Sequence, residues 1–200
     1  AREGAGDGNP VDGTLEASNV YTTLGTIANS QTLYLGVRGG FNALTDYNGL
    51  LDEVNIYNRA LSAAEVQSVY GGRNSDTRTI AIAVNATPPA AVANPAPTAA
   101  GNTLDFDGVN DFVEIPNSTS LHSDRQLTIS GWIKTDGFTR DWQNIIFKGD
   151  YPDCSATCDN REYGLWLNRD GYLLFASTPN ARAGVGPIYL STPASLIKTD

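Results

Sequence analysis

Residues 47–70 read YNGLLDEVNIYNRALSAAEVQSVY and contain a complete local structure. In residues 50–57 the side chains alternate between two faces, which is the pattern of a β-strand. The second half carries the signals of a helix start, because Ser62 can cap the first turn and Glu65 can reach back to the Ser62 amide. Gly71 ends the pattern. The stretch therefore predicts a strand, an Asn-Arg turn and one short helix of about two turns.

Composition argues against several classes of protein. The chain has 200 residues, 40% of them hydrophobic, which is enough to bury a core. Its formal net charge of −9 and its 13 scattered Lys and Arg residues argue against a nucleic-acid partner. No run of about eighteen apolar residues is present, so we expect no membrane span. The sequence contains no methionine, and we expect it to be a piece of a longer translation product.

Four stretches in the second half of the chain also have strand patterns. Residues 103–116 (TLDFDGVNDFVEIP) alternate on both sides of a glycine-centred turn. Residues 127–135 (LTISGWIKT) and 142–150 (WQNIIFKGD) predict single strands, and residues 162–177 (EYGLWLNRDGYLLFAS) predict a hairpin around an Arg-Asp-Gly turn. The second half of the chain is therefore expected to be all β.

These blocks resemble laminin-G-like jelly-roll domains of the concanavalin-A-like superfamily. Residues 49–65 are similar to the closing segment of such domains, whose last strand reads G-x-[IL]-D-E-V-x-[IV]-Y-N-R-A-L-S, and LYLG at residues 33–36 is similar to the strand before it. The four later blocks resemble the opening strands in the family's order and spacing. The resemblance implies an all-β, concanavalin-A-like jelly-roll β-sandwich with one short helix.

The order of the blocks is unusual, because the closing part precedes the opening part. Residues 1–72 resemble the C-terminal part of a laminin-G-like jelly roll, and residues 102–200 resemble the N-terminal part of one. Between them, residues 73–101 contain a strand and a Pro/Ala-rich linker. The jelly roll is therefore split or permuted across the linker. Either the chain spans parts of two tandem domains, or its two parts close on each other or on a neighbouring chain.

The resemblance also implies a calcium site where the first and last strands meet. On this sequence it places Asp52 of the last strand near Asp107, Asn110 and Asp111 of the first hairpin. Calcium prefers carboxylate, amide and carbonyl oxygens, and an acidic chain suits it. Because period-two alternation sends Asp52 and Glu53 to opposite faces, only Asp52 is expected to face the ion. The simpler alternative is that these residues form turns and satisfied structural carboxylates.

The two cysteines, Cys154 and Cys158, lie in one loop. We expect a disulfide that pins this loop, and hence an oxidising location outside the cell or at its surface. A pair of free thiols is the alternative. A metal site at these cysteines would need further Cys or His residues nearby, which the sequence lacks.

Carbohydrate binding needs exposed aromatic rings. Trp142, Tyr151 and Tyr172 are the candidates, whereas Trp132 and Trp166 lie within apolar alternation and are expected in the core.

The stretch TIAIAV, residues 79–84, has the alternation of a strand that can pair with an exposed sheet edge. Its candidate assembly residues are Thr79, Ile80, Ile82 and Val84.

No set of residues predicts catalysis. The strand with an E-x-D-x-x-E-like pattern that hydrolases of this superfamily carry does not occur, and His122 lies alone in a polar loop. We therefore expect a non-enzymatic, extracellular adhesion or glycan-binding module with a structural calcium ion. Its partner would be a glycan, an extracellular protein or neighbouring copies of itself. One alternative is a structural subunit of a fibre or surface layer, assembled by strand or half-domain complementation. A second is a non-catalytic module of a secreted hydrolase.

Overall fold

The computed structural model describes part of the chain in full and part of it by its backbone alone. Backbone and side chains are described for residues 28–38, 45–69, 103–123, 126–149, 161–178 and 188–199. For residues 7–11, 14–19, 70–71, 92–93, 98–100, 150 and 160 only the backbone is described. The predicted disulfide cysteines, Tyr151 and the predicted assembly strand at residues 79–84 lie outside the described residues.

The described residues are mostly β-strands, with one α-helix and one 3-10 turn. In chain order they are β1 (Asp7–Val11), β2 (Thr14–Asn19), β3 (Leu33–Leu35), β4 (Asn48–Tyr57), α1 (Ala63–Gly71), β5 (Val92–Ala93), β6 (Thr98–Ala100), β7 (Thr103–Asp107), β8 (Val113–Ile115), η1 (Thr119–Leu121), β9 (Thr128–Thr135), β10 (Trp142–Asp150), β11 (Asn160–Asn168), β12 (Leu173–Ser177) and β13 (Ile188–Ser191).

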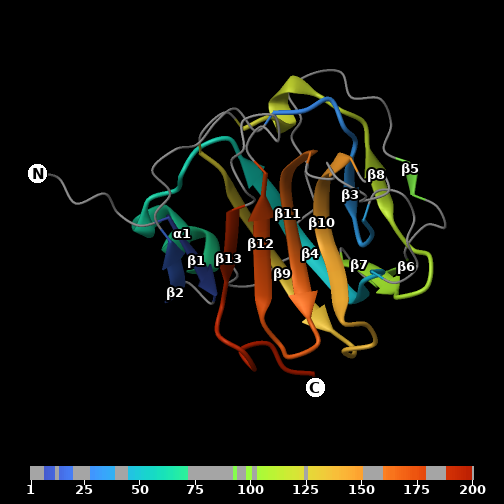
Figure 1. Ribbon diagram of the computed structural model, residues 1–200. Helices are drawn as coiled ribbons and strands as arrows, with labels where there is room; N and C mark the ends of the chain where they lie inside the picture. Colours follow the sequence, from blue (N-terminus) through green and yellow to red (C-terminus); the bar gives the residue numbers. More distant parts are fainter. Residues whose placement is uncertain are drawn as a thin grey trace, which may run out of the picture.

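The strands form two antiparallel sheets and a separate hairpin. One sheet has seven strands in the order β13-β12-β11-β10-β3-β8-β5, and the other has four in the order β6-β7-β4-β9. The hairpin consists of β1 and β2. The two sheets pack face to face, as Figure 1 shows. This arrangement confirms the predicted all-β sandwich of the concanavalin-A-like class.

The two parts of the chain contribute neighbouring strands to both sheets. Strand β3, which precedes residues 73–101, lies between β10 and β8, which follow them. Strand β4 lies in the same way between β7 and β9. The early strands β3 and β4 therefore each fill an interior position between two later strands, and neither sheet is complete without both parts.

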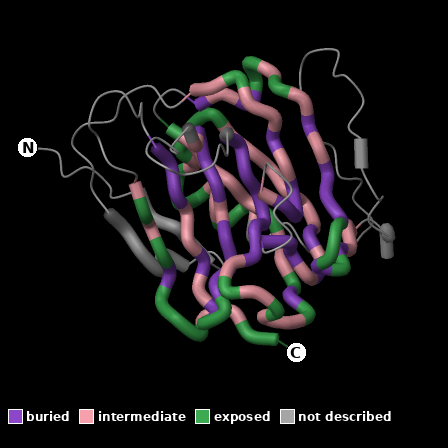
Figure 2. The backbone as a smooth tube through the Cα atoms, turned by 45° about the vertical axis from the view of Figure 1, so that its right-hand side comes forward, coloured by how far each residue is buried: buried purple, intermediate pink, exposed green. Residues whose placement is uncertain are grey.

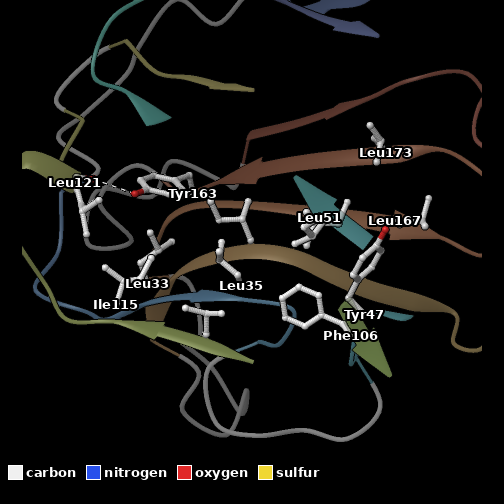
Figure 3. Packing of buried hydrophobic residues seen from close by; sticks show 13 residues of the cluster. Leu33, Leu35, Tyr47, Leu51, Phe106, Ile115, Leu121, Tyr163, Leu167 and Leu173 are labelled. Atoms are coloured by element: carbon white, nitrogen blue, oxygen red, sulfur yellow. Dashed lines mark hydrogen bonds between the residues drawn. The ribbon is translucent and has the colours of Figure 1, made fainter. Parts of the chain in front are cut away.

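The core lies between the sheets and takes side chains from both parts of the chain. Leu33, Leu35, Tyr47 and Leu51 come from the early part and are at most 1% exposed. Figure 3 shows them among later residues such as Phe106, and the Tyr47 and Phe106 rings meet at 6.0 Å between centroids. Buried stretches run along the middle of the strands and exposed ones gather at the turns, as Figure 2 shows. The two early strands are therefore bound by side chains as well as by backbone pairing.

Helix α1 begins where its capping signals predict. The Ser62 amide donates to Glu65 Oε2 at 2.8 Å, and the Glu65 amide donates to Ser62 Oγ at 3.3 Å. Arg59 adds an ion pair to the same carboxylate at 2.7 Å. This is the predicted capping box, and the helix ends at Gly71 as expected.

Strand β4 departs from strict alternation in its middle. Its register with β9 shifts between Asp52 and Asn55, and Glu53 has a φ of 48°. Asp52 lies opposite Trp132, and Glu53 Oε2 accepts a hydrogen bond from Trp132 Nε1 at 3.2 Å. The prediction that alternation separates the two acids is therefore wrong, because a β-bulge brings both to the outer face of the four-stranded sheet. Trp132 lies half-buried on that outer face and not in the core.

We predict that the two leucines at the start of β4 differ strongly in their effect on stability. Leu51 is 0% exposed in the core, so Leu51→Ala should lower the free energy of unfolding by about 2–5 kcal/mol. Leu50 points to the outer face and is half-buried, so Leu50→Ala should cost about 1 kcal/mol or less. Urea denaturation measures both. Equal losses would contradict the register of β4 between β7 and β9.

Candidate functional site

The outer face of the seven-stranded sheet carries an aromatic cluster of its own. Register places Phe147 opposite Gly164, Gly164 opposite Ala176, and Trp166 opposite Leu174, so these side chains share the face that points away from the core. Phe147, Trp166 and Ala176 are buried and form a second apolar cluster. A Cβ at Gly164 would overlap the Trp166 ring, so glycine lets the indole lie flat on the strand.

Two arginines lie over this cluster. The Arg161 guanidinium carbon is 5.5 Å from the centroid of the Trp166 ring, and that of Arg38 is 5.9 Å from the centroid of Phe147. These distances fit cation–π contacts. Two positive charges therefore lie over the aromatic cluster, although the whole chain is acidic.

Trp142 and Tyr172 meet at one end of the same face. Their rings are 5.7 Å apart and nearly perpendicular, at 86°, and both side chains are half-buried. Trp142 lies opposite Asn168, whose Nδ2 donates to the Asp141 carbonyl at 3.0 Å. Two of the three aromatic residues predicted for sugar binding are thus brought together. Trp166 is buried in the second cluster, as the sequence predicted, although that cluster lies outside the main core.

A hollow of about 320 Å³ lies beside the β11–β12 turn that Tyr172 follows. The C-terminal segment closes one side of it, because the Ser195 and Ile197 amides donate to the Asp170 and Gly171 carbonyls at 2.8 and 2.9 Å. Its lining is formed by Phe138, Arg169, Asp170, Gly171, Ser195, Ile197, Lys198 and Thr199. The hollow is open to solvent, and its lining includes neither Trp142 nor Tyr172.

The predicted calcium ligands are not all brought together. Asp107 lies opposite Asn48, and Asp52 is four residues further along β4, a separation of about 13 Å at about 3.4 Å per residue. Ligand oxygens lie about 2.3–2.6 Å from a calcium ion, so Asp52 and Asp107 cannot share one. In the described residues no group of three or more Asp, Glu, His or Cys side chains is placed to hold a metal.

The other three predicted ligands form one loop with its own hydrogen bonds. Asp107 Oδ1 accepts from the amides of Val109 and Asn110 at 2.8 and 3.4 Å. Asp111 Oδ2 accepts from the Asp107 amide at 3.0 Å. These bonds are those of a turn, and the calcium assignment stays a prediction.

Asp46 adds a buried carboxyl beside this loop that sequence reasoning missed. It is 2% exposed, and its Oδ2 has no hydrogen-bond partner. Burial raises the pKa of Asp46 to about 6; nearby Arg140 opposes the rise and Asp107 adds to it. No local sequence signal marks this residue, since its burial depends on strands from both parts of the chain.

A buried ionic network at the far end of the sandwich was also missed. Lys148 and Glu162 are both 0% exposed, with Nζ 3.2 Å from Oε2. His122 Nδ1 lies 3.1 Å from the same oxygen. His122 therefore does not lie alone in a polar loop, as the sequence suggested, but belongs to this network.

Comparison with known families agrees with the resemblance. Residues 11–67 match the family model Laminin_G_3 of the concanavalin A-like lectin/glucanase superfamily. The predicted resemblance is confirmed. This laminin-G-like segment contains β3 and β4, the two strands that complete both sheets. The match indicates a carbohydrate-binding or related module. A search of curated proteins and of solved structures found no match to the chain. Among the described residues no helix is long and apolar enough to cross a membrane.

We predict that Asp46→Asn flattens the dependence of stability on pH. The pKa of Asp46 is about 6 in the fold, against an ordinary 3.8, so the folded state binds more protons than the unfolded state between these values. Stability contributed by this group is therefore present at low pH and is lost as pH rises through about 6. The variant should lose less stability than the wild type between pH 4 and 7, as measured by urea denaturation. Replacing the exposed Asp136 by Asn is the control, and an identical slope in Asp46→Asn and wild type would contradict the assignment.

Proposed function

We propose that the protein is an extracellular adhesion module that binds a glycan on the outer face of its seven-stranded sheet. The observation that carries the proposal is the perpendicular Trp142–Tyr172 pair at one end of that face. Both rings are half-buried, so each keeps surface for a ligand while its position is held by neighbours. The family match over residues 11–67 supports a carbohydrate as the ligand class.

The chemistry around the pair suits a sugar. Apolar faces of sugar rings pack on aromatic rings, and hydroxyl groups need polar partners at the edge of the contact. Such partners are present, because Arg169 and Asp141 form an exposed ion pair at 2.7 Å immediately beside Trp142.

The proposal includes no catalytic step. It includes the predicted disulfide between Cys154 and Cys158, a bond that forms in an oxidising location such as the outside of the cell. It also retains a structural calcium ion, at the loop around Asp107 and Asp111. The fit there is incomplete, because calcium needs about six to eight oxygen ligands and the loop's carboxylates already accept backbone amides. A calcium titration that leaves the melting temperature unchanged would remove the ion from the proposal.

Assembly by half-domain complementation remains the second candidate, as a fibre or surface-layer subunit. It is favoured by one observation, the interior position of β3 and β4 between strands of the later part. A copy of the chain could donate these strands to its neighbour instead of to itself. Light scattering distinguishes the two, since donation between copies gives dimers or filaments. The third candidate, a non-catalytic module of a secreted hydrolase, has no structural observation of its own.

We predict that glycan binding depends on the aromatic pair. A glycan array followed by calorimetry on the strongest binder should give an affinity that Trp142→Ala and Tyr172→Ala each weaken about tenfold or more. Trp132→Ala is the matched control, because Trp132 is also half-buried but lies on the opposite outer face. Thermal unfolding of each variant separates lost contacts from lost folding. Binding that survives both substitutions, or that Trp132→Ala weakens equally, would contradict the site.

A further inference from the structure

Lys148 is a buried primary amine next to an amide side chain. Its Nζ lies 2.9 Å from Asn117 Oδ1 and 3.2 Å from Glu162 Oε2, and the Lys148 and Glu162 side chains are 0% exposed. Amine, amide and carboxylate come from three separate elements, namely β10, the loop after β8, and β11. The sandwich therefore holds a nucleophile, an electrophile and a proton acceptor within contact of one another.

Burial of Lys148 disfavours a permanent ammonium charge. It lowers the pKa of the lysine, although Glu162 opposes this. The Gln31 and Asn29 carbonyls, 2.7 and 3.1 Å from Nζ, accept hydrogen bonds from the charged amine and hold it beside Asn117 until Glu162 takes a proton.

We propose that Lys148 and Asn117 form a covalent amide cross-link between their side chains, with Glu162 moving the protons. Glu162 takes a proton from Nζ, and the neutral amine attacks Cγ of Asn117. The Nζ–Cγ bond forms and the Cγ–Nδ2 bond breaks. Two protons that leave Nζ end on Nδ2, so one ammonium ion departs and Glu162 is again ionised. No oxidant, reductant or other reactant is consumed.

The surroundings of the three groups suit both the release of the ammonium ion and the new amide. Asn117 lies at the surface, so the ammonium ion has a path to solvent. The new amide keeps one N–H, for which the Gln31 carbonyl is the nearest acceptor. Glu162 keeps its other donors, because Oε1 accepts from the Ser123 amide at 2.7 Å and Oε2 from the Asn29 amide at 3.1 Å. Loss of the lysine charge therefore does not leave this carboxylate without hydrogen bonds.

The test is the intact mass of the full folded chain, measured after reduction and alkylation. We expect the protein to be lighter than its sequence by one ammonia molecule, and residue 148 to resist trypsin within a peptide joined to the one that contains Asn117. A mass equal to that of the sequence would overturn the proposal. So would a succinimide at Asn117, which has the same mass but leaves cleavage after Lys148 intact. A peptide joined through Asn29, whose Oδ1 is 3.4 Å from Nζ, would overturn the assignment to Asn117.

Two variants each remove one chemical role from the site. Lys148→Arg retains a positive charge but has no primary amine, and Glu162→Gln retains hydrogen bonding but cannot take the proton. Both should have the mass of their sequence, whereas Asn29→Ser should still show the loss of ammonia. A cross-link that forms to the same extent in Glu162→Gln would show that this carboxylate does not move the protons.

Discussion

Insertion of β4 between β7 and β9 is the constraint on which the rest of the structure depends. The strand pairs with both neighbours along Gly49–Leu51, so its backbone is satisfied only when the two parts of the chain come together. The side chains of β4 point to the two faces of the sheet: Leu51 packs in the core and Leu50 lies on the outer face. An open gap at this position would expose two strand edges and a row of apolar side chains. Pairing between strands that are far apart in the sequence thus completes both sheets, even though the closing segment precedes the opening one.

The buried pair Lys148–Glu162 plays the same joining role at the other end of the sandwich. Burial of two charges is costly unless their remaining hydrogen bonds are made. Here the partners come from both parts of the chain: Asn29 and Gln31 from the early part, and Asn117 and Ser123 from the later one. Before a cross-link forms, removing either charge alone would leave the other buried without its counter-ion; after it forms, Glu162 still accepts from the Ser123 and Asn29 amides.

The sequence predicted features whose signals are local and missed those that depend on distant strands. The capping box of Ser62 and Glu65 could be recognised because both residues lie within one turn. The bulge at Asp52 could not, because it is defined by the register of β4 against β9, which lies far later in the chain. Likewise, Trp142 and Tyr172 could each be named as candidates, but their contact follows only from the pairing of β10, β11 and β12. The family resemblance supplied the strand order, whereas cross-strand contacts required the structure.

Charge is distributed unevenly between the two outer faces. The four-stranded sheet presents Asp52, Glu53, Asp105 and Asp107 outward, because each lies on the side opposite the core. The seven-stranded sheet presents Arg38 and Arg161 over its aromatic cluster, with Glu114 on the same face opposite Tyr34. Because exposed charges are screened over about 8–10 Å, a ligand at Trp142 and Tyr172 responds mainly to these two rings and to the adjacent Asp141–Arg169 ion pair. A net charge of −9 therefore does not describe the surface that carries Trp142 and Tyr172. The contact between these two rings makes the outer face of the seven-stranded sheet the better candidate for recognition.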